Sequence, residues 1–356
     1  MVDTFVLGKI LALATLSTLL AFAWTPLLTH FLYRYKMGKS IRSAVNAPMF
    51  AKMHAKKAGV PTMGGLLMWV TPLVIACIFY GIHVLAPQSV LGELNFLSRS
   101  QTWLPLAALV AAGMLGLADD FLNVRGIGAA GGGIHIRHRL LLYTVIAAIG
   151  AWWFYAKLDW SSIHIPFAGD VTVGWWYMPI FIVVVVGTSF SVNQTDGLDG
   201  LAGGTLASAF GAYAVIALIQ GQIDLAALCA VIMGALITFL WFNIYPARFI
   251  MGDTGAMSLG VTLAVIAMLT DSAALLPVIG IVFVVEAVTT AIQLVSKKLF
   301  GKKVFLIAPI HHHFEAKGWP EPKVVMRFWL ISWIGAGLGI MIALLDQAAL
   351  AQQLSL

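Results

Sequence analysis

Residues 224–242 read DLAALCAVIMGALITFLWF, a stretch with one charged residue at its start and apolar side chains at nearly every other position. About 20 predominantly apolar residues are enough for an α-helix to cross the hydrocarbon core of a bilayer. The rest of the chain has the same character, because 60% of its 356 residues are hydrophobic and only 10% are charged. A typical soluble domain has about a quarter of its residues charged. The composition therefore excludes a soluble globular protein.

Nine further apolar runs flank this stretch on both sides. They lie at residues 5–33, 61–83, 103–118, 140–156, 175–192, 200–219, 255–270, 274–296 and 327–346. Most are near the length of a membrane-spanning helix. The predicted fold class is an all-α integral membrane protein with about ten transmembrane helices, in a single polytopic domain covering 1–356. The run at 255–270 is short. If it were not a span, the loops after it would lie on the opposite side of the membrane.

The basic residues predict the orientation in the membrane. Eighteen of the 21 Lys and Arg residues lie in or beside the first, third, seventh and ninth loops, and the exceptions are Lys9, Arg99 and Lys157. Loops rich in Lys and Arg stay in the cytoplasm, so these odd-numbered loops are predicted to be cytoplasmic and both termini to be outside. Basic loops beside a membrane also attract anionic lipids and phosphorylated substrates. The predicted cytoplasmic segments lie near residues 34–60, 119–139, 193–199, 243–254 and 297–326.

Five aspartates gather at this predicted cytoplasmic side. Asp119 and Asp120 end the third span in GLADDF, Asp196 and Asp199 open the sixth in NQTDGLDGLAGG, and Asp253 opens the eighth in FIMGDTGAMSLG. Grouped carboxylates repel one another unless a cation joins them. Mg²⁺ binds through one or two carboxylates together with substrate phosphates, so the cluster predicts a magnesium site. The alternative is a set of charged helix ends favoured by the helix dipole, which explains one aspartate more easily than five.

The spacing of these aspartates gives two further predictions. Asp196 and Asp199 are three residues apart, so both are predicted to point from one face of the first turn of the sixth span. Asp253 and Thr254 directly precede a span, where exposed backbone N–H groups are suited to hold a phosphate.

A histidine triplet lies in the ninth loop, in APIHHHFEAKGWPEP. Three successive side chains cannot point in one direction, so at most two of His311, His312 and His313 are expected to touch one ligand. The contiguous triplet lacks the usual spacing of zinc ligands, and contacts to phosphate oxygens are the preferred interpretation over a solvated loop. Lys57, close to Thr62, is suited either to countering phosphate charge or to anchoring the loop. Glu286 lies in an apolar run and is interpreted as a structural residue, with a cavity-lining role as the alternative.

Several of these motifs together resemble one family. They are PTMGG at 61–65, DDF at 119–121, NQTDGLDGLAGG at 193–204, FNIYPARFIMGDTG at 242–255 and PIHHHFEAKGWPEPKVVMRFW at 309–329. In this order they look like the phospho-N-acetylmuramoyl-pentapeptide transferases, the MraY family within the polyprenyl-phosphate N-acetylhexosamine-1-phosphate transferase superfamily. The His triplet followed by FEAKGW is the most specific motif, because related transferases that use UDP-GlcNAc carry a different His loop.

The resemblance implies a Mg²⁺-dependent enzyme of the bacterial inner (cytoplasmic) membrane with a cytoplasmic active site. The implied reaction moves phospho-MurNAc-pentapeptide from UDP-MurNAc-pentapeptide to undecaprenyl phosphate, giving lipid I and UMP in peptidoglycan synthesis. Membrane lipids are further implied partners, a homodimer is implied by the family only, and no nucleic acid is expected. The alternatives are a UDP-GlcNAc:polyprenyl-phosphate GlcNAc-1-phosphate transferase and a transporter, although a transporter would place ionisable groups near the middle of the membrane.

The resemblance also implies roles for individual residues. The implied catalytic residues are Asp119, Asp120, Asp253, His311, His312 and His313. The implied substrate-binding residues are Lys57, Thr62, Asn193, Asp196, Gly197, Leu198, Asp199, Asn243 and Arg139. The implied metal-binding residues are Asp253, Asp196 and Asp119.

The chain departs from the family pattern at several positions, including Arg139, where Lys is common. Asn123 stands where Lys is common, Ile250 where Phe is common, and Phe190 where Asn is common. Arg125 is expected to replace the missing lysine charge, and Phe249 to replace the missing phenylalanine in base stacking. Two mechanisms remain open at this stage. In one, Asp119 or Asp120 accepts or orients the proton of the lipid phosphate, and in the other Asp253 is a nucleophile.

Overall fold

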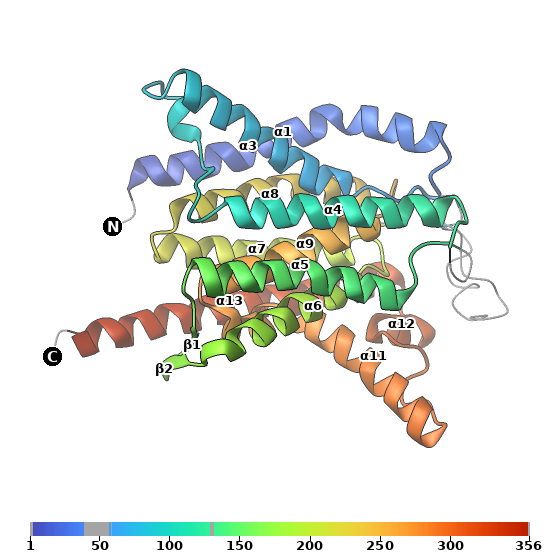
Figure 1. The fold of residues 1–356 in the computed structure, drawn as a ribbon. Coiled ribbons are helices and arrows are strands. Elements are labelled where there is room, and N and C mark those ends of the chain that lie inside the picture. Colours follow the sequence, from blue (N-terminus) through green and yellow to red (C-terminus); the bar gives the residue numbers. More distant parts are fainter. Residues whose placement is uncertain (1–2, 39–56, 58, 129–131, 355–356) are drawn as a thin grey trace.

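The computed structural model describes residues 3–38, 57, 59–128 and 132–354, and this part is almost entirely helical (Figure 1). The α-helices are α1 (Thr4–Arg34), α3 (Leu66–Leu85), α4 (Trp103–Val124), α5 (Ile136–Lys157), α6 (Tyr177–Thr195), α7 (Leu201–Ile219), α8 (Ile223–Asn243), α9 (Gly252–Leu269), α10 (Leu276–Ile279), α11 (Ile281–Phe300), α12 (Ile310–Ala316) and α13 (Glu321–Leu354). Short 3-10 turns are η2 (Gly92–Leu94), η4 (Gly174–Trp176) and η5 (Ala273–Leu275).

Nine of the described helices are long and apolar enough to cross a membrane, and a bent helix pair brings the number to ten. The predicted all-α membrane fold is therefore confirmed. The bent pair corresponds to the run at 274–296, which was predicted as one span. It bends by 81° between the η5–α10 segment and α11. Gly280 lies at the break and Pro277 just before it, and sharp bends in helices arise at such residues. Beyond the bend, α11 leaves the bundle (Figure 1).

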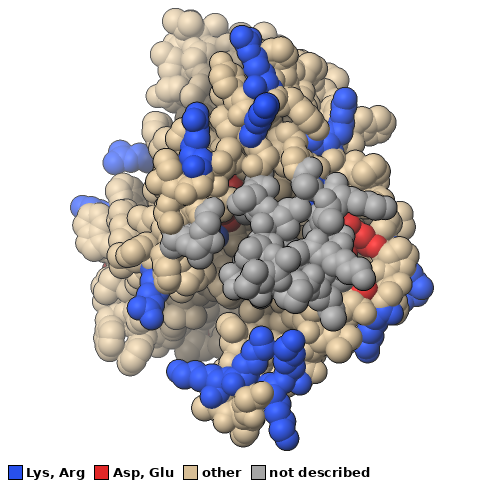
Figure 2. All heavy atoms as spheres, turned by 90° about the vertical axis from the view of Figure 1, so that its right-hand side faces the viewer, with Lys and Arg blue, Asp and Glu red and all other residues tan. Residues whose placement is uncertain are grey.

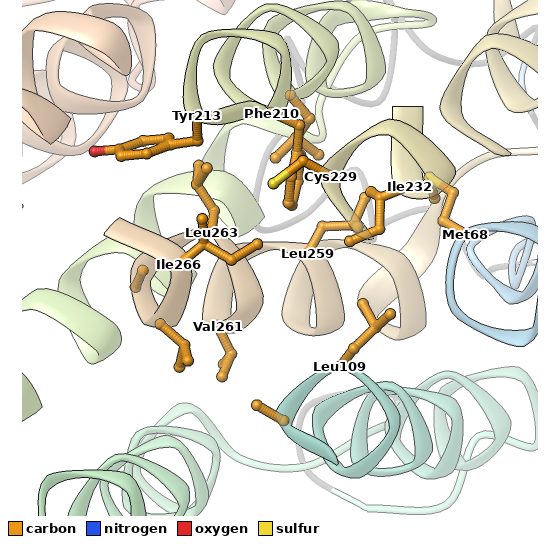
Figure 3. Close-up of a cluster of buried hydrophobic side chains, with 14 of the residues drawn as sticks. Met68, Leu109, Phe210, Tyr213, Cys229, Ile232, Leu259, Val261, Leu263 and Ile266 are labelled. Atoms are coloured by element: carbon orange, nitrogen blue, oxygen red, sulfur yellow. The ribbon is translucent and has the colours of Figure 1, made fainter. Parts of the chain in front are cut away.

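Helix α9 is the centre of the bundle. Each of its 18 residues is buried, and side chains from several other helices converge on it. Figure 3 shows Leu259 and Leu263 of α9 with Leu109 of α4, Phe210 of α7 and Cys229 of α8 around them. Because no face of α9 is open, its position is set by protein contacts on every side. The short run 255–270 is thus confirmed as a helix, and it is the innermost one.

Glycines let the neighbouring backbones come close to the start of α9. A Cβ on Gly116 of α4 would lie 2.3 Å from the carbonyl oxygen of Asp253, and a Cβ on Gly65 would lie 2.2 Å from the backbone nitrogen of Gly255. Small residues at helix contacts allow this closeness. They bring the DDF and GDTG motifs together at one end of the bundle.

The two ends of the bundle differ. Both termini lie at one end, beside a two-stranded antiparallel sheet that the sequence did not predict, formed by β1 (Ser162–Ile165) and β2 (Gly169–Thr172) (Figure 1). We call this the hairpin end. The other end carries α12 and the loops between α4 and α5 and between α8 and α9, and we call it the α12 end. Figure 2 shows many Lys and Arg side chains on the α12 end, as the predicted loop topology requires; its cytoplasmic location stays a prediction.

Candidate active site

The five predicted aspartates lie together at the α12 end, but on different kinds of backbone. Asp119 and Asp120 are within the last two turns of α4, and Asp253 is the second residue of α9. The prediction that Asp196 and Asp199 share the first turn of a span is wrong. Helix α6 ends at Thr195 and α7 begins at Leu201, so both aspartates lie in the connecting turn. That turn ends at Gly200, whose φ of +82° is left-handed and favours glycine.

Arg139 of α5 connects the two aspartates at the centre of the cluster. Its guanidinium donates to Asp119 and, at 3.1 Å, to Asp253, and a longer contact of 3.4 Å reaches the amide oxygen of Asn193. The Asn193 amide nitrogen donates to the same Asp253 oxygen at 2.6 Å, and the backbone nitrogen of Ile134 donates to Asp119. One cation thus lies between two carboxylates whose side chains are almost fully buried, and its charge balances only one of them. Burying these charges costs desolvation free energy, and ionisable groups buried in a membrane protein usually mark a functional site.

Two further carboxylates, those of Asp120 and Asp196, cap the N-terminus of α9. Asp120 accepts from the Thr254 backbone nitrogen at 3.0 Å and from the Thr62 hydroxyl at 3.2 Å. Asp196 accepts from the backbone nitrogen of Gly252 at 3.1 Å. The prediction that exposed N–H groups at this terminus hold a phosphate is therefore not supported by the geometry. The terminus attracts negative charge as expected, but protein carboxylates provide it.

Lys57 forms a second charged group with two carboxylates. Its ammonium lies 2.7 Å from Asp199 and 2.5 Å from Glu321. Burial disfavours the charged amine, but the two carboxylates outweigh this effect and the pKa of Lys57 is raised above its ordinary value. The Asp199 side chain also accepts from the backbone nitrogen of Ala247 at 3.0 Å. Sequence reasoning did not select Glu321, although it lies within the WPEP segment of the motif that was recognised.

Asn243 and Leu198 support the turn that carries Asp199. Asn243 accepts from the backbone nitrogen of Gly200 at 2.9 Å and donates to the carbonyl of Phe249 at 2.9 Å, so it ties the α6–α7 turn to the loop before α9. Leu198 is buried against Val324 and Phe328 of α13. Its side chain therefore packs inside the protein, and any contact with a substrate would come from its backbone.

The histidine triplet lies on the short helix α12, with two of its members turned toward the aspartate turn. A Cβ on Gly197 would lie 2.3 Å from Nε2 of His311 and 3.2 Å from Nε2 of His312. Each of these rings uses its other nitrogen for a carboxylate, with Nδ1 of His311 2.9 Å from Glu286 and Nδ1 of His312 2.7 Å from Glu315. The glycine at 197 thus leaves room for both imidazoles beside the turn.

His313 faces a different part of the loop. Its Nδ1 accepts from the backbone nitrogen of Leu306 at 3.1 Å. Burial and the nearby charge of Lys317 lower the pKa of His313, so the ring is suited to this acceptor role. The geometry therefore separates His313 from the pair formed by His311 and His312, in keeping with the expectation that at most two of the three touch one ligand.

Glu286 has a specific partner. Its carboxylate and the His311 ring are both fully buried. A carboxylate on Nδ1 fixes the tautomer and the direction of an imidazole, so Glu286 orients His311 toward Gly197. Sequence reasoning noted that an unpaired carboxylate would be costly here, but the partner lies 25 residues away and spacing alone could not identify it.

Carboxylates are the side chains at this site that suit Mg²⁺. Among residues 3–38, 57, 59–128 and 132–354, no group of three His, Cys, Asp or Glu side chains is arranged to hold a metal ion. Mg²⁺ requires fewer protein ligands when substrate phosphates complete its shell, and Asp119 and Asp253 contact one guanidinium from two sides. This pair therefore fits the ion in donor chemistry. Asp196 is directed to the backbone of α9 instead.

The departures from the family pattern have structural settings. Asn123 contacts the carbonyl of Gly132 at 3.4 Å and thereby holds the glycine-rich loop next to Asp119. The expectation that Phe249 replaces a missing stacking residue is wrong, because its ring is fully buried between Phe239 and Phe242. The large side chain fills the space next to Gly64 and is closed to a ligand. Nothing in the structure gives Phe190 a role in the cluster.

Comparisons with known proteins relate this chain to one family. Residues 102–271 match the family described as glycosyl transferase family 4. The chain is 39% identical to the phospho-N-acetylmuramoyl-pentapeptide-transferase of Chloroflexus aggregans, over 94% of this chain and 88% of that protein. It is 40% identical to the protein of the same name from a Geobacillus species, over 94% of this chain and 98% of that protein. The chain therefore belongs to the phospho-N-acetylmuramoyl-pentapeptide-transferase family.

Proposed function

We propose that this protein transfers phospho-MurNAc-pentapeptide from UDP-MurNAc-pentapeptide to undecaprenyl phosphate, giving lipid I and UMP. The observation that carries the proposal is the meeting of Asp119, Arg139, Asn193 and Asp253, from four different helices, at one end of a membrane bundle. The names of its relatives support the donor and the reaction type. The positive charge of the loops supports a cytoplasmic location for this end, in the inner membrane, with both termini outside.

The reaction brings two anions together, so its main requirement is neutralisation of charge. An oxygen of the lipid phosphate attacks the β-phosphorus of the donor, a new P–O bond forms, and the bond between that phosphorus and the bridging oxygen of UMP breaks. Positioned cations stabilise the charge that develops on the phosphoryl oxygens and on the departing UMP. Arg139 and Lys57 are the described basic side chains inside the cluster. His311 and His312 present their Nε2 atoms beside Gly197 as further phosphate contacts.

Among the carboxylates, Asp119 is the better candidate to orient the lipid phosphate or to take its proton. Asp120 receives hydrogen bonds from Thr62 and from the Thr254 backbone, which gives it a structural role at the start of α9. Asp119 instead accepts from the Ile134 backbone and from Arg139, a basic side chain that a phosphate can also contact. The alternative, in which Asp253 is a nucleophile, would produce a covalent phospho-sugar enzyme. Absence of any such adduct under single-turnover conditions would reject this alternative.

We further propose that Asp119 and Asp253 hold Mg²⁺. When bound, the ion would neutralise pyrophosphate oxygens of the donor and stabilise the UMP that leaves. Both carboxylates already share one cation, Arg139, which would then have to give up part of its contact. Chelation of divalent ions is expected to abolish activity reversibly, with recovery on adding Mg²⁺.

The deciding experiment measures UMP release by purified protein in detergent, with undecaprenyl phosphate and Mg²⁺. UDP-MurNAc-pentapeptide and UDP-GlcNAc are compared as donors. Activity with the first donor only is expected. Activity with UDP-GlcNAc would assign the chain to the sister transferases, and inactivity with both donors in folded protein would reject the proposal.

A further inference from the structure

An open cavity of about 670 Å³ lies between the end of α1 and the loop that joins α8 to α9. It is lined by Thr25, Pro26, Thr29, His30, Tyr33, Arg34, Phe242 and Arg248. None of the predicted site residues lines it. The cavity is therefore separate from the aspartate cluster, although both lie at the α12 end.

The described lining of this cavity is basic and has no acidic member. It contains two arginines, Arg34 and Arg248, and His30 as a further nitrogen donor. Neither arginine forms an ion pair with a carboxylate in the described part of the chain. The Arg248 guanidinium instead lies over the Phe242 ring, 5.8 Å from its centre, where cation–π attraction holds it without neutralising its charge. The cavity thus offers two unneutralised guanidiniums, the groups best suited to a phosphate.

The cavity also lies at the level where lipid headgroups would be. Arg34 is the last residue of the first span, and α1 and α8 pack side by side (Figure 1). Phe22 of α1 contacts Trp241 of α8 with ring centres 6.0 Å apart. Trp241 lies at this seam and is 72% exposed, so an apolar surface is open beside it. An apolar surface next to a basic cavity matches a molecule that has both a phosphate and acyl chains.

We propose that this cavity binds the headgroup of an anionic phospholipid, with the phosphate between Arg34 and Arg248 and the acyl chains along the α1–α8 seam. A free phosphate would leave the exposed seam unused. Two guanidiniums favour a lipid with net negative charge over a zwitterionic one, because the ammonium group of a zwitterionic lipid cancels part of the attraction.

The cavity is joined by hydrogen bonds to the loop between α8 and α9, and this loop contacts the candidate active site through Asp199. The Tyr33 hydroxyl donates to the carbonyl of Arg248 at 2.7 Å. The backbone nitrogen of Arg248 donates to the carbonyl of Phe242 at 2.8 Å. The preceding residue, Ala247, donates to Asp199. A lipid held by Arg248 therefore restrains the segment that supports Asp199. This part of the inference is independent of which sugar the enzyme transfers.

The test is native mass spectrometry of the full protein exchanged into mixed micelles that contain phosphatidylglycerol and phosphatidylcholine. The wild type is expected to retain phosphatidylglycerol preferentially. Each arginine near an anionic headgroup changes affinity by about fivefold, so the double variant Arg34→Gln/Arg248→Gln is expected to lose this preference by about thirtyfold. The control Lys297→Gln/Lys298→Gln removes the same charge from the exposed end of α11 and is expected to leave the preference unchanged.

Three results would overturn the proposal. They are an unchanged preference in the arginine variant, an equal loss in the lysine variant, and displacement of phosphatidylglycerol by undecaprenyl phosphate or by millimolar inorganic phosphate. Displacement by undecaprenyl phosphate would make the cavity a substrate site, and displacement by inorganic phosphate would make it a free-anion site. Because both arginine side chains are exposed, the variant is expected to fold, and its thermal unfolding in lipid-free detergent checks this.

Discussion

The two ends of the bundle both combine histidines with carboxylates, and they differ in burial. At the hairpin end, His164 lies between Asp170 and Asp346, with nitrogen–oxygen distances of 2.6 and 2.7 Å. Asp271 accepts from the His164 backbone and Asp346 from the backbone of Phe167. The Asp170 side chain is 67% exposed, so water shares its charge. These contacts tie the hairpin to α13 and to the turn after α9.

At the α12 end the carboxylates are sealed from solvent. Asp119, Asp120, Asp199 and Asp253 are each at most 5% exposed, and two pairs of carboxylates each share a single basic side chain. Burying more negative than positive charge is costly. At the hairpin end the excess charge is shared with water through Asp170, although Asp346 is buried. At the α12 end the excess charge stays inside the protein, as we expect of a site that takes a cation and an anionic substrate.

The largest expected effect tests this contrast directly. Asp253→Asn removes one charge from the buried cluster and is expected to lower kcat by about a hundredfold to a thousandfold, as removal of a charge-stabilising group does in other enzymes. UMP release is the measurement. Asp170→Asn, the matched change at the hairpin end, is expected to leave kcat unchanged. Equal losses in both variants would erase the functional difference between the two ends.

A smaller loss is expected from crowding the histidine pair. Gly197→Ala places a methyl group 2.3 Å from the present position of Nε2 of His311. Because Glu286 holds the ring from the other side, the histidine must shift, and kcat/KM is expected to fall by roughly tenfold to thirtyfold for a displaced phosphate contact. Gly187→Ala in α6 meets no atom within 4 Å and serves as the control. Wild-type kinetics in Gly197→Ala would remove His311 from the site.

A variant of Lys57 distinguishes a role in substrate binding from a role in catalysis. Lys57→Gln is expected to raise KM for the UDP donor by about tenfold with little change in kcat, because the ammonium binds phosphate equally in ground and transition states. The raised pKa keeps the amine charged throughout the assay range, so the wild-type KM should not respond to its titration. The control Glu321→Gln keeps the ammonium and one carboxylate partner. A tenfold fall in kcat at unchanged KM for Lys57→Gln would contradict a binding role.

The smallest effect concerns the hairpin end. Burial disfavours the imidazolium of His164, but hydrogen bonds and charges from Asp170 and Asp346 outweigh it, so the pKa of His164 is raised above 6.5. A raised pKa stabilises the folded protein fully below the unfolded value and loses this effect as pH rises through the folded value. The difference in Tm between wild type and His164→Gln is expected to shrink between pH 6 and pH 9, by about 1–3 °C.

Thermal unfolding in detergent at several pH values is the measurement for this prediction. His138→Gln, an exposed histidine at the α12 end, is the control and is expected to show no such trend. A wild-type advantage that grows with pH would mean that His164 is bound in its neutral form.

The sequence predicted the helices well because each apolar run is long and carries few charges. It did not predict the bend at Gly280, because the hydrophobicity of a run does not show whether its helix is straight. It also did not predict the hairpin, whose strands are only four residues each. The motifs identified the residues at the α12 end. Which of these residues contact each other, such as Asp120 and the backbone of Thr254, depends on how α4 packs against α9. The order of residues in the sequence does not show this packing.

The full enclosure of α9 also bears on how the chain is built. The long helices packed against it, α3 to α8, all precede it in the sequence, so they leave the ribosome before it does. When α9 leaves the ribosome, the helices that will surround it are already present, and we expect them to form a protein-lined slot for it. A helix that enters such a slot never has to be soluble in lipid on all faces. Chain order thus permits a central helix to carry buried polar groups, including Asp253, Thr254 and Ser258, that a lipid-facing span would tolerate poorly.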